Sequence, residues 1–195
     1  MTATPTGRLS RDSLAAAKGV IKLLRFDPTW VKAFDLSRLG FVRSFFAQIL
    51  ALPLVLLFFV LTTRADGGDV TRNLLFQTGL SDGIDVIVYP ILVLVAARLL
   101  KLKNWTAFIT VLNWGDLVFA TLFAMVSGLT IAGDVGLAAV RIVWLVVLAP
   151  LQILFAWRAA RETMGTDISV TVLLVVLELA LSVGSDQLAA LILPA

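Results

Sequence analysis

The residues with the strongest potential for chemistry in this sequence are polar side chains that interrupt long apolar stretches. They are Asn113, Asp116, Arg141 and Glu178. A charge at the centre of a bilayer costs about 2.5–3.5 kcal/mol, so charged groups at that depth face protein or water and not lipid. We therefore expect all four side chains to face the interior of a helix bundle, with Arg141 paired to Asp116 or Glu178.

Three roles fit such an intramembrane polar cluster. The first role is a relay for protons or cations, the second is a structural group that fixes the register of the helices, and the third is an interface to another membrane subunit. The argument for a relay is weakened because no second acid lies one or two helical turns from Asp116 in the same apolar stretch. The residues alone leave the three roles open.

The residue types that are missing exclude much catalytic chemistry. The chain has no Cys and no His, which excludes disulfides, iron–sulfur clusters, thiolate zinc sites and cysteine nucleophiles. Imidazole ligation of haem and histidine acid–base chemistry are excluded as well. No phosphate-binding loop, nucleophile elbow or HExxH motif occurs. We therefore expect no catalytic residues, no cofactor and no metal site, and we predict that the protein is not an enzyme.

The apolar stretches define the fold class. Of the 195 residues, 59% are hydrophobic, and the mean hydropathy is +0.98. Because soluble domains are about 45–50% apolar, this excess indicates an all-α, polytopic integral membrane protein with a five-transmembrane-helix bundle. Residues 1–40 form a basic amphipathic segment and residues 41–195 form the transmembrane domain. The expected spans, each near the ~20 residues that cross a bilayer, are 41–63, 84–102, 105–127, 135–160 and 168–185.

The distribution of Lys and Arg predicts the orientation of these spans. Basic residues cluster before the first span, between the second and third, and between the fourth and fifth. The other connections are poor in Lys and Arg; the 64–82 loop, in which we expect a short interfacial helix at 73–77, has only Arg64 and Arg72. Basic loops stay cytoplasmic, so we predict a cytoplasmic N-terminus and a non-cytoplasmic C-terminus. At ~1.5 Å per residue this orientation places Asp116 and Glu178 about 15 Å deep.

An amphipathic helix is predicted at 10–26, before the first span. Its basic residues are Arg11, Lys18, Lys22 and Arg25. A basic amphipathic helix beside a membrane binds anionic lipids of the inner leaflet, and we favour that membrane-surface role over docking on a cytoplasmic protein. Nucleic-acid binding is not expected, because the basic residues alternate with apolar ones next to a membrane.

Several short motifs resemble those of the bacterial Yip-like membrane proteins, a family named for eukaryotic relatives that interact with Ypt/Rab GTPases. The resemblance rests on the run Val111-Leu112-Asn113-Trp114-Gly115-Asp116-Leu117, on Arg25-Phe26-Asp27-Pro28, on Phe34-Asp35 with Ser44-Phe45, and on Ala160-Arg161-Glu162-Thr163-Met164-Gly165. It implies five spans, a cytoplasmic N-terminus and a multi-pass protein of the bacterial inner membrane. It implies no catalytic residues.

Two classes of function follow from these observations. The first is a non-enzymatic membrane protein, either a Yip-like scaffold or assembly factor or an accessory subunit of a larger membrane complex. The alternative is a small transporter or proton-coupled permease that uses the buried charges. The expected partners are the lipid bilayer, anionic lipids and, for an accessory subunit, other membrane protein subunits.

Overall fold

The computed structural model describes the backbone of residues 5–132 and 137–193 and the side chains of residues 10–64, 66–128 and 139–193. Within these ranges the chain is all-α, with seven α-helices, one 3-10 helix and one π-helical turn. The elements are α1 (Pro5–Leu24), η1 (Pro28–Ala33), α2 (Arg38–Ala65), α3 (Arg72–Leu99), α4 (Trp105–Ala132), α5 (Leu137–Val143), η2 (Trp144–Leu148), α6 (Ala149–Met164) and α7 (Ile168–Ile192).

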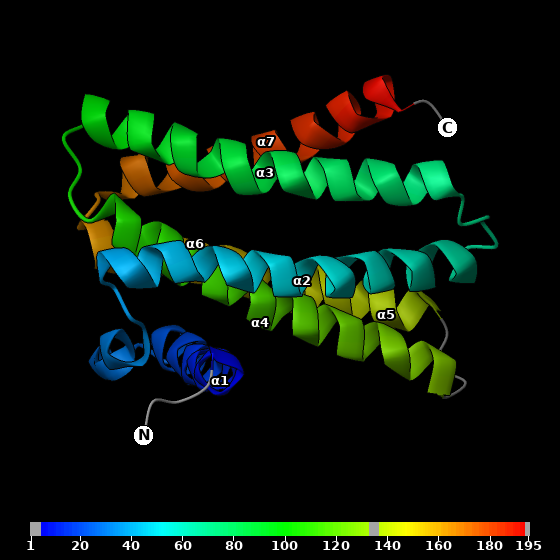
Figure 1. The fold of residues 1–195 in the computed structure, drawn as a ribbon, viewed down its shortest axis with the longest axis horizontal. Coiled ribbons are helices and arrows are strands. Elements are labelled where there is room, and N and C mark those ends of the chain that lie inside the picture. Colours follow the sequence, from blue (N-terminus) through cyan, green and yellow to red (C-terminus); the bar gives the residue numbers. More distant parts are fainter. Residues whose placement is uncertain (1–4, 133–136, 194–195) are drawn as a thin grey trace.

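The long helices form two layers that run side by side. One layer holds α2, α4 and α6, and the other holds α3 and α7 (Figure 1). Helix α4 lies at the centre, because it contacts α2, α3, α6 and α1, and it is the most buried of the long helices. Helix α3 packs mainly on α7 and makes few contacts with α2 and α4. The two layers also meet where α6 packs on α7.

Five helices of the described chain are long and apolar enough to cross a membrane: Arg38–Arg64, Arg72–Leu99, Trp105–Gly128, Ala139–Met164 and Ile168–Ile192. The all-α class and the existence of five long apolar helices that could cross a membrane are confirmed. The boundaries of the second and fifth spans were predicted too short, at 84–102 and 168–185. Thr71 caps α3 by accepting a hydrogen bond from the Leu74 backbone N–H at 3.2 Å. The expected interfacial helix at 73–77 is consequently the first turn of α3 itself.

The fourth span is continuous from α5 through η2 into α6. The backbone N–H of Ala149 donates to the carbonyl of Trp144, which gives the wide π-helical turn just before Pro150. Proline has no N–H, and π-turns are one way in which a helix accommodates such an interruption. The start of this span was predicted at residue 135, which lies outside the described residues.

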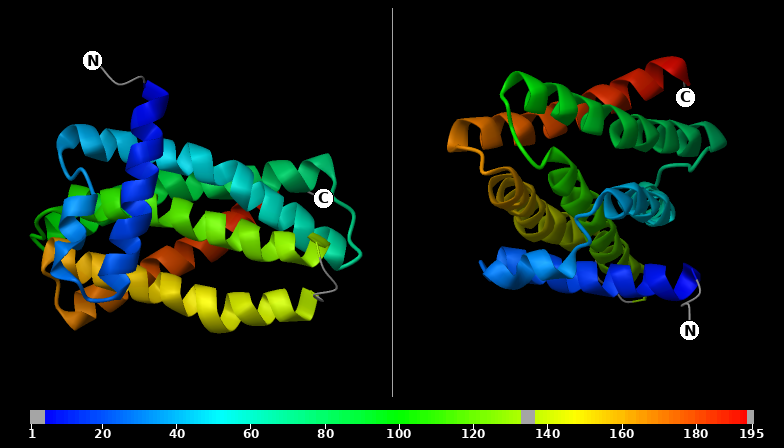
Figure 2. Two further views of the ribbon diagram at one scale, coloured as in Figure 1. Left: turned by 90° about the horizontal axis from the view of Figure 1, so that it is seen from below. Right: turned by 60° about the vertical axis from the view of Figure 1, so that its left-hand side comes forward.

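Helix α1 packs across one side of the bundle, against α4 and α6, nearer the end where α2 begins (Figure 1). Figure 2 shows α1 running across the long axes of the other helices. Asp27 caps η1, because its carboxylate accepts a hydrogen bond from the Thr29 N–H at 2.8 Å. Hydrogen bonding to the backbone and side chain of Thr29 lowers the pKa of Asp27. Asp35 accepts from the Ser37 N–H at 3.1 Å just before α2. The chain thus makes two capped turns between the crossing helix and the first span.

Candidate functional site: a carboxyl-lined cavity

A cavity of about 220 Å³ lies between the two helix layers, about halfway along the bundle. Helices α2, α3, α4, α6 and α7 all contribute to its wall. The polar lining residues comprise four carboxylic acids, three amides, one phenol and one hydroxyl: Asp82, Asp85, Asp116, Glu178, Gln48, Asn113, Gln152, Tyr89 and Ser182. Among the lining residues there is no Lys or Arg. The cavity therefore combines several potential negative charges without a built-in positive partner.

Hydrogen bonds between α2 and α4 orient one side of this cavity. The Gln48 Nε2 donates to Asp116 Oδ2 at 2.8 Å and to Asn113 Oδ1 at 3.1 Å. Asn113 Nδ2 in turn donates to Ser44 Oγ at 2.9 Å, and Ser44 Oγ donates to the Phe41 carbonyl at 2.7 Å. Asp116 and Asn113 were predicted as site residues. The structure brings them together through Gln48, which the sequence prediction did not include.

The predicted site residue Glu178 also lines the cavity, from α7. Its carboxyl group forms no hydrogen bond or ion pair with any described residue, whereas Asp116 is held by Gln48. On the facing helix, the Tyr89 hydroxyl donates to the Leu174 carbonyl at 3.3 Å. At ~1.5 Å per residue, Gln48, Tyr89, Asp116 and Glu178 all lie about 15 Å from the ends of their helices that are near η1. The expected equal depth of the two acids agrees with this arrangement.

The predicted pairing of Arg141 with Asp116 or Glu178 is wrong. Arg141 instead forms an ion pair with Asp66, in the turn that follows α2, and both side chains are exposed. Arg141 lies only about 6 Å along the axis from Leu137, where α5 begins, and a long arginine side chain reaches outward from such a position. The cavity acids therefore have no arginine partner from α5.

Two acids of the cavity were not recognised from the sequence. Asp82 had been assigned to the 64–82 loop, and Asp85 fell inside the predicted second span without being recognised as a site residue; both lie inside α3 and line the cavity. Asp85 Oδ1 is buried and has no hydrogen-bond partner among the described residues. The signal was available in the spacing of Asp82, Asp85 and Tyr89, which places them on one face of a helix. It was missed because the second span was predicted to begin at residue 84, which separated Asp82 from Asp85 and Tyr89.

The two ends of the cavity differ in polarity. Toward η1 it is closed by apolar side chains from three helices: Val93, Phe108 and Leu174 are at most 1% exposed. Toward the opposite end, the Ser81 hydroxyl lies 2.6 Å from Asp186 Oδ1, to which it donates, and 3.1 Å from Ser185 Oγ. Polar groups thus continue from the cavity toward this end along α3 and α7, whereas toward η1 they continue only through the hydrogen bonds of Asn113 and Ser44 between α4 and α2.

The predicted surface residues of α1 divide into two groups. Arg11, Lys18 and Arg25 are exposed and share one helix face with the exposed Leu14 and Ile21. The opposite face, with Ala16, Val20 and Leu23, is buried against the bundle.

Lys22 differs from the other basic residues of this helix. Its ammonium group donates to Thr29 Oγ1 at 2.9 Å and so stabilises the turn into η1. The mixed basic and apolar face therefore consists of Arg11, Leu14, Lys18, Ile21 and Arg25, without Lys22.

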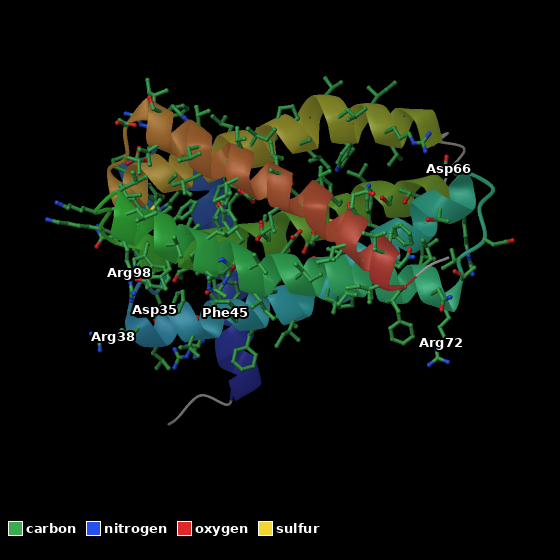
Figure 3. All side chains as sticks on the ribbon, turned by 90° about the horizontal axis from the view of Figure 1, so that it is seen from above. Asp35, Arg38, Phe45, Asp66, Arg72 and Arg98 are labelled. Atoms are coloured by element: carbon green, nitrogen blue, oxygen red, sulfur yellow. The ribbon has the colours of Figure 1, made fainter. Side chains whose placement is uncertain are left out.

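The basic residues of the whole chain are unequally divided between the ends of the bundle. Of the 16 Lys and Arg residues, all except Arg64, Arg72 and Arg141 belong to segments at the end near η1. Figure 3 shows Arg38 and Arg98 at that end of the long helices and Arg72 at the opposite end.

In the described part of the chain, no group of three or more acids is close enough together to hold a metal ion. No protein-family model, curated protein or solved structure matches the chain.

Proposed function

We propose that this protein is a small, non-enzymatic membrane transporter that passes protons or other cations through the carboxyl-lined cavity. The observation that carries the proposal is that Asp82, Asp85, Asp116 and Glu178, from three helices, line one cavity with no basic residue. Ionisable groups inside membrane spans are costly and typically mark ion or proton pathways. A purely structural cluster would be expected to satisfy its acids internally, whereas the Glu178 carboxyl has no such partner.

The proposed orientation places η1 and the crossing helix α1 in the cytoplasm. It is supported by the excess of Lys and Arg at that end of the bundle, which is the signature of cytoplasmic segments in multi-pass proteins. The cavity then communicates through Asp82, Ser81 and Asp186 with the non-cytoplasmic side. The apolar closure of Val93, Phe108 and Leu174 separates it from the cytoplasm.

Transport requires that this closure opens. Val93 and Leu174 belong to the α3 and α7 layer, whereas Phe108 belongs to α4. Because α3 makes few contacts with α2 and α4, we propose that the α3–α7 pair moves as a unit against the other layer and changes the contact between α6 and α7. Rigid-body movement of one packed group against another is a common basis of alternating access.

Proton flux into liposomes tests the proposal. The full chain is reconstituted with a pH-sensitive dye inside, and a potential is applied with potassium and valinomycin. We expect flux well above that of protein-free vesicles, and a loss of about tenfold or more in Asp116→Asn and in Glu178→Gln. Glu162→Gln is the matched control, because Glu162 is an exposed acid at the end of α6, paired with Arg158. Unchanged flux in both cavity variants would contradict the proposal.

A second candidate is the Yip-like scaffold or accessory subunit. It is supported by an apolar groove of about 420 Å³ between α6 and α7, lined by Pro150, Ile153, Leu154, Trp157, Val172, Val175 and Val176. Another membrane helix fits such a groove. Copurification in mild detergent distinguishes the two candidates: a stoichiometric partner that is lost in Val176→Trp, together with flux equal to that of empty vesicles, would favour the accessory role.

A further inference from the structure

The charge balance of the cavity indicates the kind of ligand that it accepts. Four acids face it from α3, α4 and α7, while α2 and α6 contribute only the amides Gln48 and Gln152 among their polar lining groups. Tyr89 is the remaining titratable group of the wall. Because no Lys or Arg lines the cavity, a ligand that complements it carries positive charge.

Two of these acids have acceptor capacity that the protein leaves unused. The carboxyl group of Glu178 has no hydrogen-bond or ion-pair partner among the described residues. Asp85 Oδ1 is buried beside the same cavity and also has no partner in the described chain. Buried polar atoms are nearly always satisfied in folded proteins, so the unsatisfied Asp85 Oδ1 points to a bound group in a space that Glu178 also lines.

The size and the apolar wall of the cavity narrow the class of cation. One water occupies about 30 Å³ of liquid volume, so a space of about 220 Å³ holds a small organic molecule and exceeds what a bare metal ion fills. Phe119, Phe123 and Tyr89 contribute aromatic rings to its wall, and aliphatic Val55 and Leu112 also line it. Aromatic faces attract organic cations, including quaternary ammonium groups.

We propose that the cavity binds a small organic ammonium ion, with its charge beside Glu178 and Asp85 and its alkyl groups against the aromatic wall. A proton and the ammonium ion compete for the same carboxyl groups, so uptake of one accompanies release of the other. This inference rests on the proposed transport function and adds its substrate class.

Tetramethylammonium is a suitable probe, because its charge is permanent and it carries no proton of its own. Binding of the radiolabelled ion is measured with the full chain in lipid nanodiscs at about pH 8 and about pH 5. We expect saturable binding at the higher pH and an affinity at least about tenfold lower at the acidic pH. In Glu178→Gln and in Asp85→Asn the affinity falls about tenfold or more, whereas Glu162→Gln binds as the unmodified chain does.

Each outcome bears on the inference separately from transport itself. Absence of saturable binding by the unmodified chain overturns the inference, and so does equal competition by sodium, potassium or magnesium at matched concentration. An affinity in both Glu178→Gln and Asp85→Asn that equals that of the unmodified chain also overturns it. If proton flux in liposomes nevertheless depends on Asp116 and Glu178, the proposed function survives without this substrate class. Size-exclusion profiles and helical circular dichroism identify a variant that fails to fold. If one of Glu178→Gln and Asp85→Asn does not fold, the binding affinity of the other tests the inference.

Discussion

The side-chain amide of Gln48 bridges two acceptors on the neighbouring helix α4, with Nε2 at 2.8 Å from Asp116 Oδ2 and at 3.1 Å from Asn113 Oδ1. Both amide hydrogens are used in this way. The bridge fixes the carboxyl group of Asp116 at the wall of the cavity and couples the two most tightly packed helices of the bundle. Neither α2 nor α4 carries a basic residue that lines this space.

Replacing Gln48 with Leu removes both hydrogen bonds and leaves Asp116 without its donor. Hydrogen bonds between membrane helices contribute on average about 0.6 kcal/mol and at most about 1.7 kcal/mol. We expect a loss of stability of about 1 kcal/mol and a reduced proton flux, measured by thermal unfolding in detergent and by the liposome assay. Gln187→Leu is the control, because Gln187 is exposed near the end of α7. An equal effect of the two substitutions would contradict the role of the bridge.

Gly115 allows α4 and α6 to approach each other closely. A Cβ atom at this position would lie 2.1 Å from Phe155 Cε1, and Phe155 is only 1% exposed. Gly115→Ala therefore forces the two helices apart, and we expect a loss of about 1–3 kcal/mol in unfolding free energy. Gly79→Ala in α3 is the control, because a Cβ there meets nothing within 4 Å. Phe155→Leu should restore part of the stability of Gly115→Ala; no recovery would show that the clash lies elsewhere.

The turn before α2 should respond to acid. Hydrogen bonds from the Ser37 side chain and backbone, with the Arg43 guanidinium nearby, lower the pKa of Asp35. A pKa that is lowered in the folded state stabilises the protein at pH values above the ordinary aspartate pKa of about 3.9. This contribution to stability is lost as the pH falls through the folded-state pKa. The difference in melting temperature between the unmodified chain and Asp35→Asn should be largest above about pH 5 and should shrink near pH 3. Asp69→Asn, an exposed loop substitution, is the control.

The ion pair between Arg141 and Asp66 should not be part of the transport machinery. Both side chains are largely exposed, and exposed ion pairs contribute about 0–1 kcal/mol. We expect Arg141→Gln to keep the proton flux of the unmodified chain and to change stability by less than about 1 kcal/mol. A loss of flux comparable to that of Glu178→Gln would place Arg141 in the pathway, as the sequence alone had suggested.

The exposed face of α1 should lie in the anionic lipid surface. The chain has no Cys, so Ile21→Cys provides one attachment point for an environment-sensitive dye. In nanodiscs with anionic lipid we expect a blue-shifted emission that lipid-borne quenchers reduce, and a smaller shift when Lys18 and Arg25 are replaced by Gln. Equal spectra in anionic and zwitterionic lipid would contradict this orientation. An isolated α1 peptide is a poor substitute, because it would expose the buried face of Ala16, Val20 and Leu23.

The five spans were predictable because hydropathy and helix length act over many residues. The start of α3 was not, because a single cap at Thr71 and polar side chains in the first turns make its beginning resemble a loop. The depths of Asp116 and Glu178 followed from counting along the spans.

The partners of those acids depend on which helices are neighbours, and hydropathy does not contain that information. Asp85 and Glu178 are far apart in the sequence and line one space only because α3 packs on α7. Arg141 illustrates the reverse error: a long side chain near the end of a span was assigned to the interior, although it reaches Asp66 in the turn beyond.

The pairing of α3 with α7 also bears on how the chain is made. Helix α7 is synthesised after α3, so the polar face of α3, with Ser81, Asp82 and Asp85, enters the bilayer before its main packing partner exists. During synthesis of the intervening spans this face is exposed to lipid, to the insertion machinery or to the incomplete layer of α2 and α4. The arrival of α7 therefore completes the burial of this face, and a chain shortened before Ile168 would leave the polar side of α3 without its main packing partner.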